Sequence, residues 1–526
     1  MIALKQILKK IPLGRKITYL GEKFYNGINS YYSEILLKQL DIDEIIESNK
    51  HYLFIKNKDF INDIKLYAKV DLGVILKKYN KDVEQSITDK ELNSIIHDYY
   101  EIETDVDNSY TSTYSKETEC TYKLHDFQDR IRRKVINQLF NGEKKFLVHL
   151  PTGAGKTRTA GEIITDFIRL SSANTLLNDR IKIIWVAQQE ELCYQAYETI
   201  KFLLEAKSTS DFAFGHFYGN NEIDKDIVHK PAVIFCSIQK LLQNYQNEFW
   251  DRIRNDNYLV VVDEAHRSVA SEWVKALNSF TGNSSVYVLG LTATPGSQSI
   301  ENLQRNYSLA QYYNNNRISL MNDKYSEIQN PIQYLVEKGF LANIKRFIIK
   351  SKSTNLGSVS KDGNGKIKIS KNKLLELSTD PYRNKTIINI ILNHVKKGEK
   401  ILLFSCGTSH NRLLKELLNL ENIESQVIDA ETSNRSNIID QFKNGTLQVL
   451  LNYGVLTTGF DAPKTNVCII ARPVESIVMY SQMVGRILRG PNNGRGNKEN
   501  TLYTIKDNFS HGDYDELFNS FNEFWN

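Results

Sequence analysis

The sequence predicts an α/β protein built on two parallel sheets flanked by helices, and three features of the chain support this. After residue 120, short apolar runs alternate with amphipathic segments, which is typical of parallel strands joined by helices. This series occurs twice, without the short repeats of roughly 20–50 residues that mark a solenoid. At 526 residues, the chain is long enough for about three or four folding units.

The expected strands are short apolar runs of the kind that parallel sheets bury on both faces. In the first series they are Phe146–Leu150, Ile181–Ala187, Ala232–Ser237, Tyr258–Val262 and Val286–Leu291, and in the second Lys400–Ser405, Ser425–Asp429, Gln448–Asn452 and Val467–Ala471. The stretch 296–330 is rich in Asn, Gln, Ser and Tyr, so we expect it to be less ordered. The stretch 350–371 is expected to form an exposed loop or a small hairpin.

Residues 1–119 differ from the rest, and we expect them to form an N-terminal accessory domain. They carry no motif that indicates a function. The polar stretch 102–120, rich in Ser, Thr and acids, is typical of a linker. The basic start of the chain either contacts phosphates or forms a solvated helix face. Its cations are Lys5, Lys9, Lys10, Arg15 and Lys16.

Composition and cysteine usage exclude several classes of protein. Apolar residues make up 41% of the chain and charged residues 25%, which argues against wholesale disorder and against fibrous chains. The apolar runs are far shorter than the roughly 20 residues of a membrane span, so no membrane partner is expected. The five cysteines show no metal-ligand or redox spacing, which fits a reducing cytoplasm. The net charge of +5 permits a polyanionic partner.

The segment HLPTGAGKT has the composition of a phosphate-binding loop between a strand and a helix. Glycines allow backbone N–H groups to turn inward around a polyphosphate. The lysine places a positive charge on the outer phosphates, and the threonine hydroxyl after it can bind Mg²⁺. The residues expected to bind the nucleotide here are Thr152, Gly153, Ala154, Gly155, Lys156 and Thr157.

The segment YLVVVDEAHRS places two adjacent carboxylates at the end of an expected apolar strand. Ligands of parallel sheets bind at this edge. Asp263 suits a Mg²⁺ ligand, and Glu264 suits a general base that takes the proton of the attacking water. A helix N-cap with solvated acids is the plainer alternative. The buried strand in front and the phosphate loop upstream favour the catalytic interpretation.

These residues together resemble a superfamily 2 helicase or translocase of the DEAH type, close to restriction-enzyme motor subunits and related bacterial and phage DNA helicases. The resemblance covers about residues 121–510. It implies two tandem RecA-like domains, 120–325 and 326–526, with the accessory domain 1–119 in front. ATP and Mg²⁺ would bind between the two RecA-like domains. It further implies a role in coupling nucleotide state to nucleic-acid grip for three residues, His266, Thr292 and Thr294.

The segment SQMVGRILRG supplies the positive charges that phosphate transfer requires. Gln482, Arg486 and Arg489 fall at i, i+4 and i+7, so on one continuous helix they would share a face. A solvated basic stripe is the alternative. The resemblance implies instead that all three belong to the catalytic set, with the two arginines reaching the γ-phosphate as arginine fingers.

Other matches to this family are weaker. Gln128, in LHDFQ, is implied to read the adenine edge, although it could also be an ordinary surface glutamine. Gly459 and Asp461, in TTGFDAP, are implied to contact the ribose or coupling groups, with a helix-initiating turn as the alternative. Four residues after expected strands are candidate nucleic-acid contacts or ordinary loop residues, namely Gln188, Ser237, Gln239 and Thr408.

The resemblance implies an ATP-dependent helicase or translocase acting on DNA, as the motor of a phage-defence or restriction-type system. RNA is the less favoured nucleic acid, and an RNA helicase is one alternative. A nucleotide-gated DNA clamp that recruits an effector without unwinding is another. The chain shows no convincing nuclease motif, so a nuclease or effector would be a separate subunit.

Overall fold

The computed structural model describes most of the chain outside the predicted linker. The described residues are 4–31, 41–50, 53–54, 57–67, 123–172, 181–207, 212–244, 248–253, 258–281, 286–296, 303–320, 330–350, 360–361, 367–430, 432, 434–456, 464–474, 476–492 and 496–506. The domain boundaries expected at 119/120 and at 325/326 fall outside these ranges and stay predictions.

The first sheet has seven parallel strands in the order β3-β4-β2-β5-β6-β1-β7. They are β1 (Lys145–His149), β2 (Lys182–Ala187), β3 (Ala213–Phe217), β4 (Ala232–Ser237), β5 (Tyr258–Asp263), β6 (Val286–Thr292) and β7 (Arg317–Ile318). Successive side chains of β2 enter opposite cores, since Trp185 packs in one apolar cluster and Val186 in another. The sheet is therefore buried on both faces.

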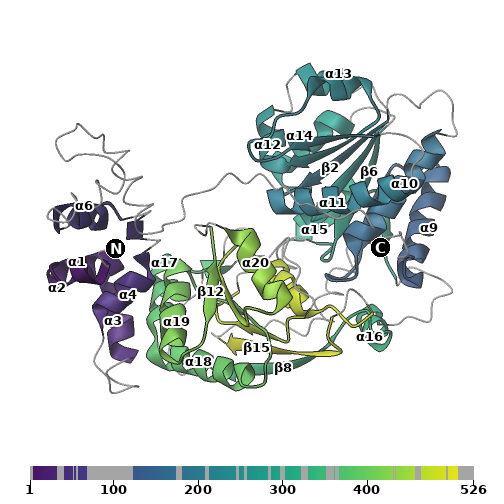
Figure 1. The fold of residues 1–526 in the computed structure, drawn as a ribbon. Coiled ribbons are helices and arrows are strands. Elements are labelled where there is room, and N and C mark those ends of the chain that lie inside the picture. Colours follow the sequence, from purple (N-terminus) through teal and green to yellow (C-terminus); the bar gives the residue numbers. More distant parts are fainter. Residues whose placement is uncertain are drawn as a thin grey trace, which may run out of the picture.

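Helices cover the two faces of this sheet (Figure 1). One apolar cluster joins it to α9 (Asp126–Phe140), α10 (Lys156–Ser172) and α11 (Glu190–Lys207), and the other to α12 (Ile238–Asn244), α13 (Glu248–Ile253) and α14 (Ser271–Thr281). This layering is what an apolar strand series alternating with amphipathic helices dictates.

The second sheet has six parallel strands in the order β12-β13-β11-β14-β15-β8. They are β8 (Asn343–Lys350), β11 (Ile401–Phe404), β12 (Ser425–Ile428), β13 (Val449–Asn452), β14 (Val467–Ile470) and β15 (Glu499–Lys506). Two of its helices, α18 (Pro381–Val395) and α19 (Thr408–Leu420), pack against it, and α20 (Arg435–Asn444) follows β12.

The predicted fold class is confirmed, and all nine expected strands are present with ends shifted by at most a residue. The prediction missed four strands. β8 and β15 carry charged and polar residues between apolar ones, and β3 and β7 lie at the two edges of their sheet. Edge strands do not need the continuous apolar run that identifies a strand buried on both faces.

The expectation of low order for 296–330 is wrong for the part of it that the structure describes. This part contains α15 (Leu303–Tyr312) and β7. Leu309 and Tyr313 are fully buried, because one face of α15 and the turn after it pack on the sheet. The hairpin expected within 350–371 is present as the antiparallel pair β9 (Ser360–Lys361) and β10 (Ile367–Lys368).

The first 67 residues contribute a small helical unit. Its described helices are α1 (Leu4–Leu8), α2 (Leu13–Leu20), α3 (Glu22–Tyr31), α4 (Ile42–Ser48) and α6 (Lys58–Tyr67). Three of the basic residues at the start of the chain form ion pairs inside this unit. They are Lys5 with Glu47, Arg15 with Asp63 and Lys16 with Asp43. These pairs favour a structural role for that basic stretch over contact with phosphates.

The helical unit docks on the second sheet domain rather than the first. α3 packs against α17 (Lys371–Thr379) and α19, beside which Figure 1 shows it. Ile28 of α3 is fully buried in the same apolar cluster as Leu413 of α19. The Asn49 side chain donates a hydrogen bond to Glu416 Oε1, at 3.0 Å.

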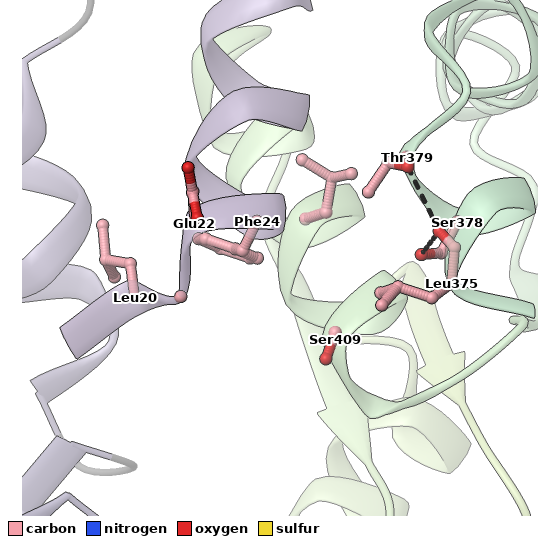
Figure 2. A pocket seen from close by; sticks show the side chains of 9 residues that line it. Leu20, Glu22, Phe24, Leu375, Ser378, Thr379 and Ser409 are labelled. Atoms are coloured by element: carbon pink, nitrogen blue, oxygen red, sulfur yellow. Dashed lines mark hydrogen bonds between the residues drawn. The ribbon is translucent and has the colours of Figure 1, made fainter. Parts of the chain in front are cut away.

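A hollow of about 290 Å³ remains at this seam (Figure 2). The hydroxyls of Ser378 and Thr379 on its wall donate to the carbonyl of Leu375, at 2.6 and 3.1 Å. Because these hydroxyls are already used at the end of α17, they are poorly placed to bind a ligand. The hollow is a gap between docked helices and lies apart from the phosphate loop.

Candidate active site

The phosphate loop lies between β1 and α10, at the carboxyl edge of the first sheet. Gly153 and Gly155 adopt φ values of +85° and +80°, in the left-handed region that favours glycine. A Cβ on Gly155 would also collide with the side-chain nitrogen of Gln128. Lys156 is the first residue of α10, so the N-terminus of this helix faces the loop. The arrangement suits an anion held by backbone N–H groups.

Gln128 braces the phosphate loop from α9. Its side chain is 3% exposed, and its carboxamide nitrogen donates to the carbonyl of Ala154 at 3.0 Å. Its carboxamide oxygen accepts from the backbone N–H of His125 at 3.1 Å. Both ends of the carboxamide are therefore bonded to backbone in this structure. The adenine-reading role expected for Gln128 stays a prediction.

The two carboxylates stand at the end of β5, as the strand pattern predicts. The Glu264 backbone N–H donates to Asp263 Oδ1 at 3.0 Å, and Glu264 adopts a left-handed φ of 53°. Left-handed backbone is strained for a residue with a side chain, and such strain gathers at functional sites. The turn separates the two acids, because it ends the strand directly after Asp263.

The surroundings of Asp263 and Glu264 shift the pKa values of the two acids in opposite directions. Burial and the neighbouring Glu264 charge raise the pKa of Asp263, although Lys156 opposes the shift. Burial acts against Glu264 as well, but the hydrogen bond from the neutral His266 and the charges of Lys156 and Arg267 outweigh it and lower the pKa of Glu264. Glu264 is thereby held ionised, the state that a proton acceptor must have.

His266 links this acid to Thr292, the last residue of β6, and through it to Thr294. Its Nδ1 lies 3.3 Å from Glu264 Oε2 and 3.3 Å from Thr292 Oγ1. The Thr292 hydroxyl donates to the Thr294 carbonyl at 2.9 Å and accepts from the Thr294 N–H at 3.0 Å. With its hydrogen used there, Thr292 can only accept from His266, so Nδ1 must carry the hydrogen. The three coupling candidates form one buried network.

His149 was not predicted from the sequence. This buried residue ends β1, and its Nε2 lies 3.3 Å from the carbonyl of Ala293. Burial, with the nearby charge of Arg317, lowers its pKa well below the usual value, so the ring is neutral. It ties the strand before the phosphate loop to the segment 292–294. A single histidine at a strand end carries no sequence signal of such a role.

Residues 481–490, here called the arginine segment, belong to the second sheet domain and contact the phosphate loop. A Cβ on Gly485 would collide with the side chain of Thr152, and Arg489 Cγ lies 3.7 Å from the Cβ position of Gly153. The Arg486 charge contributes to the lowered pKa of Lys156, after burial, which is the main cause. Arg486 and Arg489 therefore both lie near the phosphate loop.

The prediction that Gln482, Arg486 and Arg489 share one helix is wrong. The helix α21 (Ile477–Val484) ends before Arg486, and a single 3₁₀ turn, 485–487, follows. Arg486 stays beside Gln482, since its Nε donates to the Gln482 carbonyl at 3.2 Å. Arg489 lies beyond the turn and is paired through its backbone with Leu341.

Gln482 is a buried polar residue of α21. It is 8% exposed, and its side-chain nitrogen has no hydrogen-bond partner among the described residues. Leaving such a donor unsatisfied costs about 1–3 kcal/mol. A ligand could satisfy this donor, although other buried polar atoms of the described residues are unsatisfied as well.

The remaining predicted residues are placed less decisively. Gly459 and Asp461 lie outside the described residues. Gln188 follows β2 and Ser237 ends the neighbouring strand β4, so they stand at the same sheet edge as Asp263. Ser237 is buried, whereas Gln239 is exposed on α12. Thr408 is the first residue of α19 in the other domain and is partly exposed.

The described residues show neither a metal-ligand cluster nor a disulfide. These contain no group of three or more His, Cys, Asp or Glu side chains arranged to hold a metal ion. Cys193, Cys236, Cys406 and Cys468 are buried, and none of these four forms a disulfide bond. None of the helices that the structure describes has the length and apolarity needed to cross a membrane.

Two family models match the chain, one in each of the two sheet domains. Residues 121–297 match the type III restriction enzyme res subunit, and residues 382–491 match the helicase conserved C-terminal domain. IRC3 of Saccharomyces cerevisiae, named as a candidate ATP-dependent helicase, is 27% identical over 376 residues, 70% of this chain and 49% of its own. The chain spans about half the length of relatives that it matches.

Solved structures of restriction enzymes share the fold. A fragment assigned as the HsdR subunit of a type I restriction enzyme from Vibrio vulnificus has a TM-score of 0.50 and 18% identity, over 82% of this chain and 73% of the fragment. The type ISP restriction-modification enzyme LlaBIII, bound to DNA, has a TM-score of 0.50 and 14% identity, over 76% of this chain and 29% of its own. At these identities the likeness concerns the fold alone.

Replacing Gly155 by Ala tests the geometry of the phosphate loop. The new methyl group meets Gln128 and a left-handed backbone, so we expect a loss of about 1–3 kcal/mol in unfolding free energy and loss of nucleotide binding. Thermal denaturation and fluorescent-nucleotide binding measure the two effects. Gly14→Ala is the matched control, because a Cβ there meets nothing within 4 Å in α2. Equal behaviour of the two variants would contradict the loop geometry.

Proposed function

We propose that this chain, which belongs to the superfamily 2 helicases and resembles the motors of restriction enzymes, hydrolyses ATP between its two sheet domains and uses the cycle to move along DNA. The observation that carries the proposal is the contact between the arginine segment and the phosphate loop. Lys156 and two carboxylates of the first domain thus lie close to Arg486 of the second. Hydrolysis then depends on domain closure.

The residues of the phosphate loop and the acid pair fit a nucleotide with Mg²⁺. Thr157 and the buried Asp263 would supply oxygen ligands, and the phosphates and water would supply the rest, as Mg²⁺ usually requires. The ion would neutralise charge on the phosphates when bound. A site that takes so few protein ligands need not show a cluster of three. Lys156 binds the outer phosphates, and Gln482, whose side-chain nitrogen is unsatisfied, lies one helical turn before Arg486.

Glu264 is the proposed general base. Its low pKa keeps it ionised, and His266 orients it by the hydrogen bond described above. Because His266 also bonds Thr292, a change at the acid pair on nucleotide hydrolysis reaches the segment 292–294. This segment follows β6 at the sheet edge where the candidate contacts Gln188 and Ser237 lie. Nucleotide state and nucleic-acid grip are coupled along this edge.

DNA is the favoured track. The first domain matches the res subunit of type III restriction enzymes, and residues 121–526 carry an excess of eight positive charges over their acids. Cations that neutralise phosphates give salt-dependent binding. Gln188, Gln239 and Thr408 are the proposed phosphate contacts, with Ser237 positioning the helix that carries Gln239 through its bond to Lys240. The protein acts in the cytoplasm, where its buried thiols stay reduced.

The same resemblance suggests a role in a restriction-type or phage-defence system, with a nuclease or effector on another chain. An RNA helicase and a DNA clamp without motor activity are the rival functions. ATP hydrolysis with single-stranded, duplex and forked DNA and RNA distinguishes the first rival, and triplex displacement the second. We expect duplex or forked DNA to stimulate hydrolysis and ATP to drive displacement. Stimulation by RNA alone, or hydrolysis without displacement, would transfer the assignment to the corresponding rival.

Glu264→Gln removes the proposed base while keeping the shape of the side chain. We expect ATP binding to persist and DNA-stimulated hydrolysis to fall on the order of 100-fold or more. Steady-state turnover and equilibrium nucleotide binding measure these effects. The exposed Glu222→Gln serves as control and should hydrolyse ATP normally. Normal turnover in Glu264→Gln would show that another group takes the proton.

Arg486→Ala and Arg489→Ala remove charge that closure brings to the phosphates. Each should slow turnover by roughly 10³-fold with a much smaller change in nucleotide affinity. Single-turnover hydrolysis and nucleotide titration separate the two effects. Arg133→Ala, at a 71% exposed side chain of α9, is the control and should behave as wild type. A collapse of affinity with normal turnover at saturation would exclude a finger role.

A further inference from the structure

Part of the chain between the two sheets contacts both the arginine segment and the phosphate loop. Residues 339–342, here called the connecting segment, run from α16 (Pro331–Glu337) to β8. Leu341, within it, is 1% exposed. No motif predicted a role for this segment.

On one side, the connecting segment is bonded to the arginine segment through its backbone. The Ala342 N–H donates to the Leu488 carbonyl at 2.7 Å, and the Gly490 N–H donates to the Phe340 carbonyl at 3.1 Å. An isolated antiparallel bridge pairs Leu341 with Arg489 between these bonds. The backbone that carries Arg489 is therefore held to the connecting segment as to a neighbouring strand, and the two move together.

On the other side, the side chains of the connecting segment reach the first domain. Leu341 Cδ2 lies 3.6 Å from the Cβ position of Gly153 in the phosphate loop. The ring of Phe340 packs against two rings at the start of α9, with centroid distances of 4.3 Å to His125 and 4.9 Å to Phe127. Aromatic pairs at such distances attract beyond the burial of their surface.

The rings that Phe340 meets are themselves joined to the phosphate loop. The backbone N–H of His125 bonds the side chain of Gln128, and that side chain bonds the carbonyl of Ala154. Phe127 is 1% exposed and packs in the core beneath α9. A continuous line of contacts thus runs from the phosphate loop, through Gln128 and His125, to Phe340 and on to Arg489.

We propose that Phe340 is a positioning residue, whose ring docks on His125 and Phe127 and thereby holds Arg489 at the phosphate loop. This inference rests on the proposed function of the cleft as an ATPase site. Phe340 does not touch the reacting atoms, since its ring lies at the start of α9. Backbone hydrogen bonds tie the connecting segment to Arg489. The position of the Phe340 ring against His125 and Phe127 therefore determines how well the arginine reaches the transition state.

Phe340→Ala removes the ring and leaves the backbone bonds in place. We expect turnover at saturating ATP to fall about 10-fold, with affinity for a fluorescent ADP changed less than about 3-fold, because the phosphate loop itself is intact. Phe340→Leu, which keeps apolar packing, should lose less. Phe347→Ala is the matched control, since that ring is 48% exposed on β8 and stacks on Tyr503, and it should retain full turnover.

The decisive measurement is a double-mutant cycle with Arg489→Ala. If Phe340 acts through Arg489, then adding Phe340→Ala to Arg489→Ala causes little further loss. Independent losses that multiply, or a Phe340→Ala enzyme with normal turnover, overturn the inference. Should Phe340→Ala fail to fold by thermal denaturation, the same cycle is run with Phe340→Leu and judged by the same outcomes.

These results also separate this inference from the proposed function. A wild-type protein that hydrolyses no more ATP than Lys156→Ala defeats the proposed function itself. A wild-type protein that hydrolyses ATP and depends on Arg489, but not on Phe340 through Arg489, defeats only the inference about Phe340.

Discussion

The close approach of the arginine segment to the phosphate loop is the constraint on which the candidate active site depends. Gly485 lies so near Thr152 that any side chain at position 485 would force the two domains apart. The absence of a Cβ there lets the backbone of one domain rest on the loop of the other. Without this contact, the arginines would be ordinary surface cations, because nothing in their own helix brings them to a phosphate.

Electrostatics explain why such a site waits for a ligand. Lys156 stands among Asp263, Glu264 and Arg486, and burial opposes the charge of Lys156 and of both acids. A triphosphate with its metal ion would bring charges of both signs to these residues. The phosphates would give Lys156 and Arg486 an anion to bind, and the metal ion would face the acids. The neutral His266 transmits the state of Glu264 to Thr292 through one shared hydrogen, so the acid pair and the segment after β6 respond together.

The N-terminal helices add a mechanical consequence. They are docked on α17 and α19 by a shared apolar core and by the bond from Asn49 to Glu416 (Figure 1). A movement of the second domain relative to the first must therefore carry the N-terminal unit with it. Three of its basic residues, Lys5, Arg15 and Lys16, form ion pairs inside the unit, which favours a structural role for them over contact with phosphates.

The sequence by itself determined the features that are local. Nine strands followed from short apolar runs, and the phosphate loop and the acid pair followed from contiguous residues whose chemistry depends on their spacing. Only the tertiary structure decided which distant segments meet. It ended α21 before Arg486, paired Arg489 with Leu341, seated Phe340 on His125 and added β8 and β15, whose mixed polarity gave no strand signal. Periodicity records how one segment folds, whereas the approach of segments far apart in the chain is set by packing, which leaves no local pattern to read.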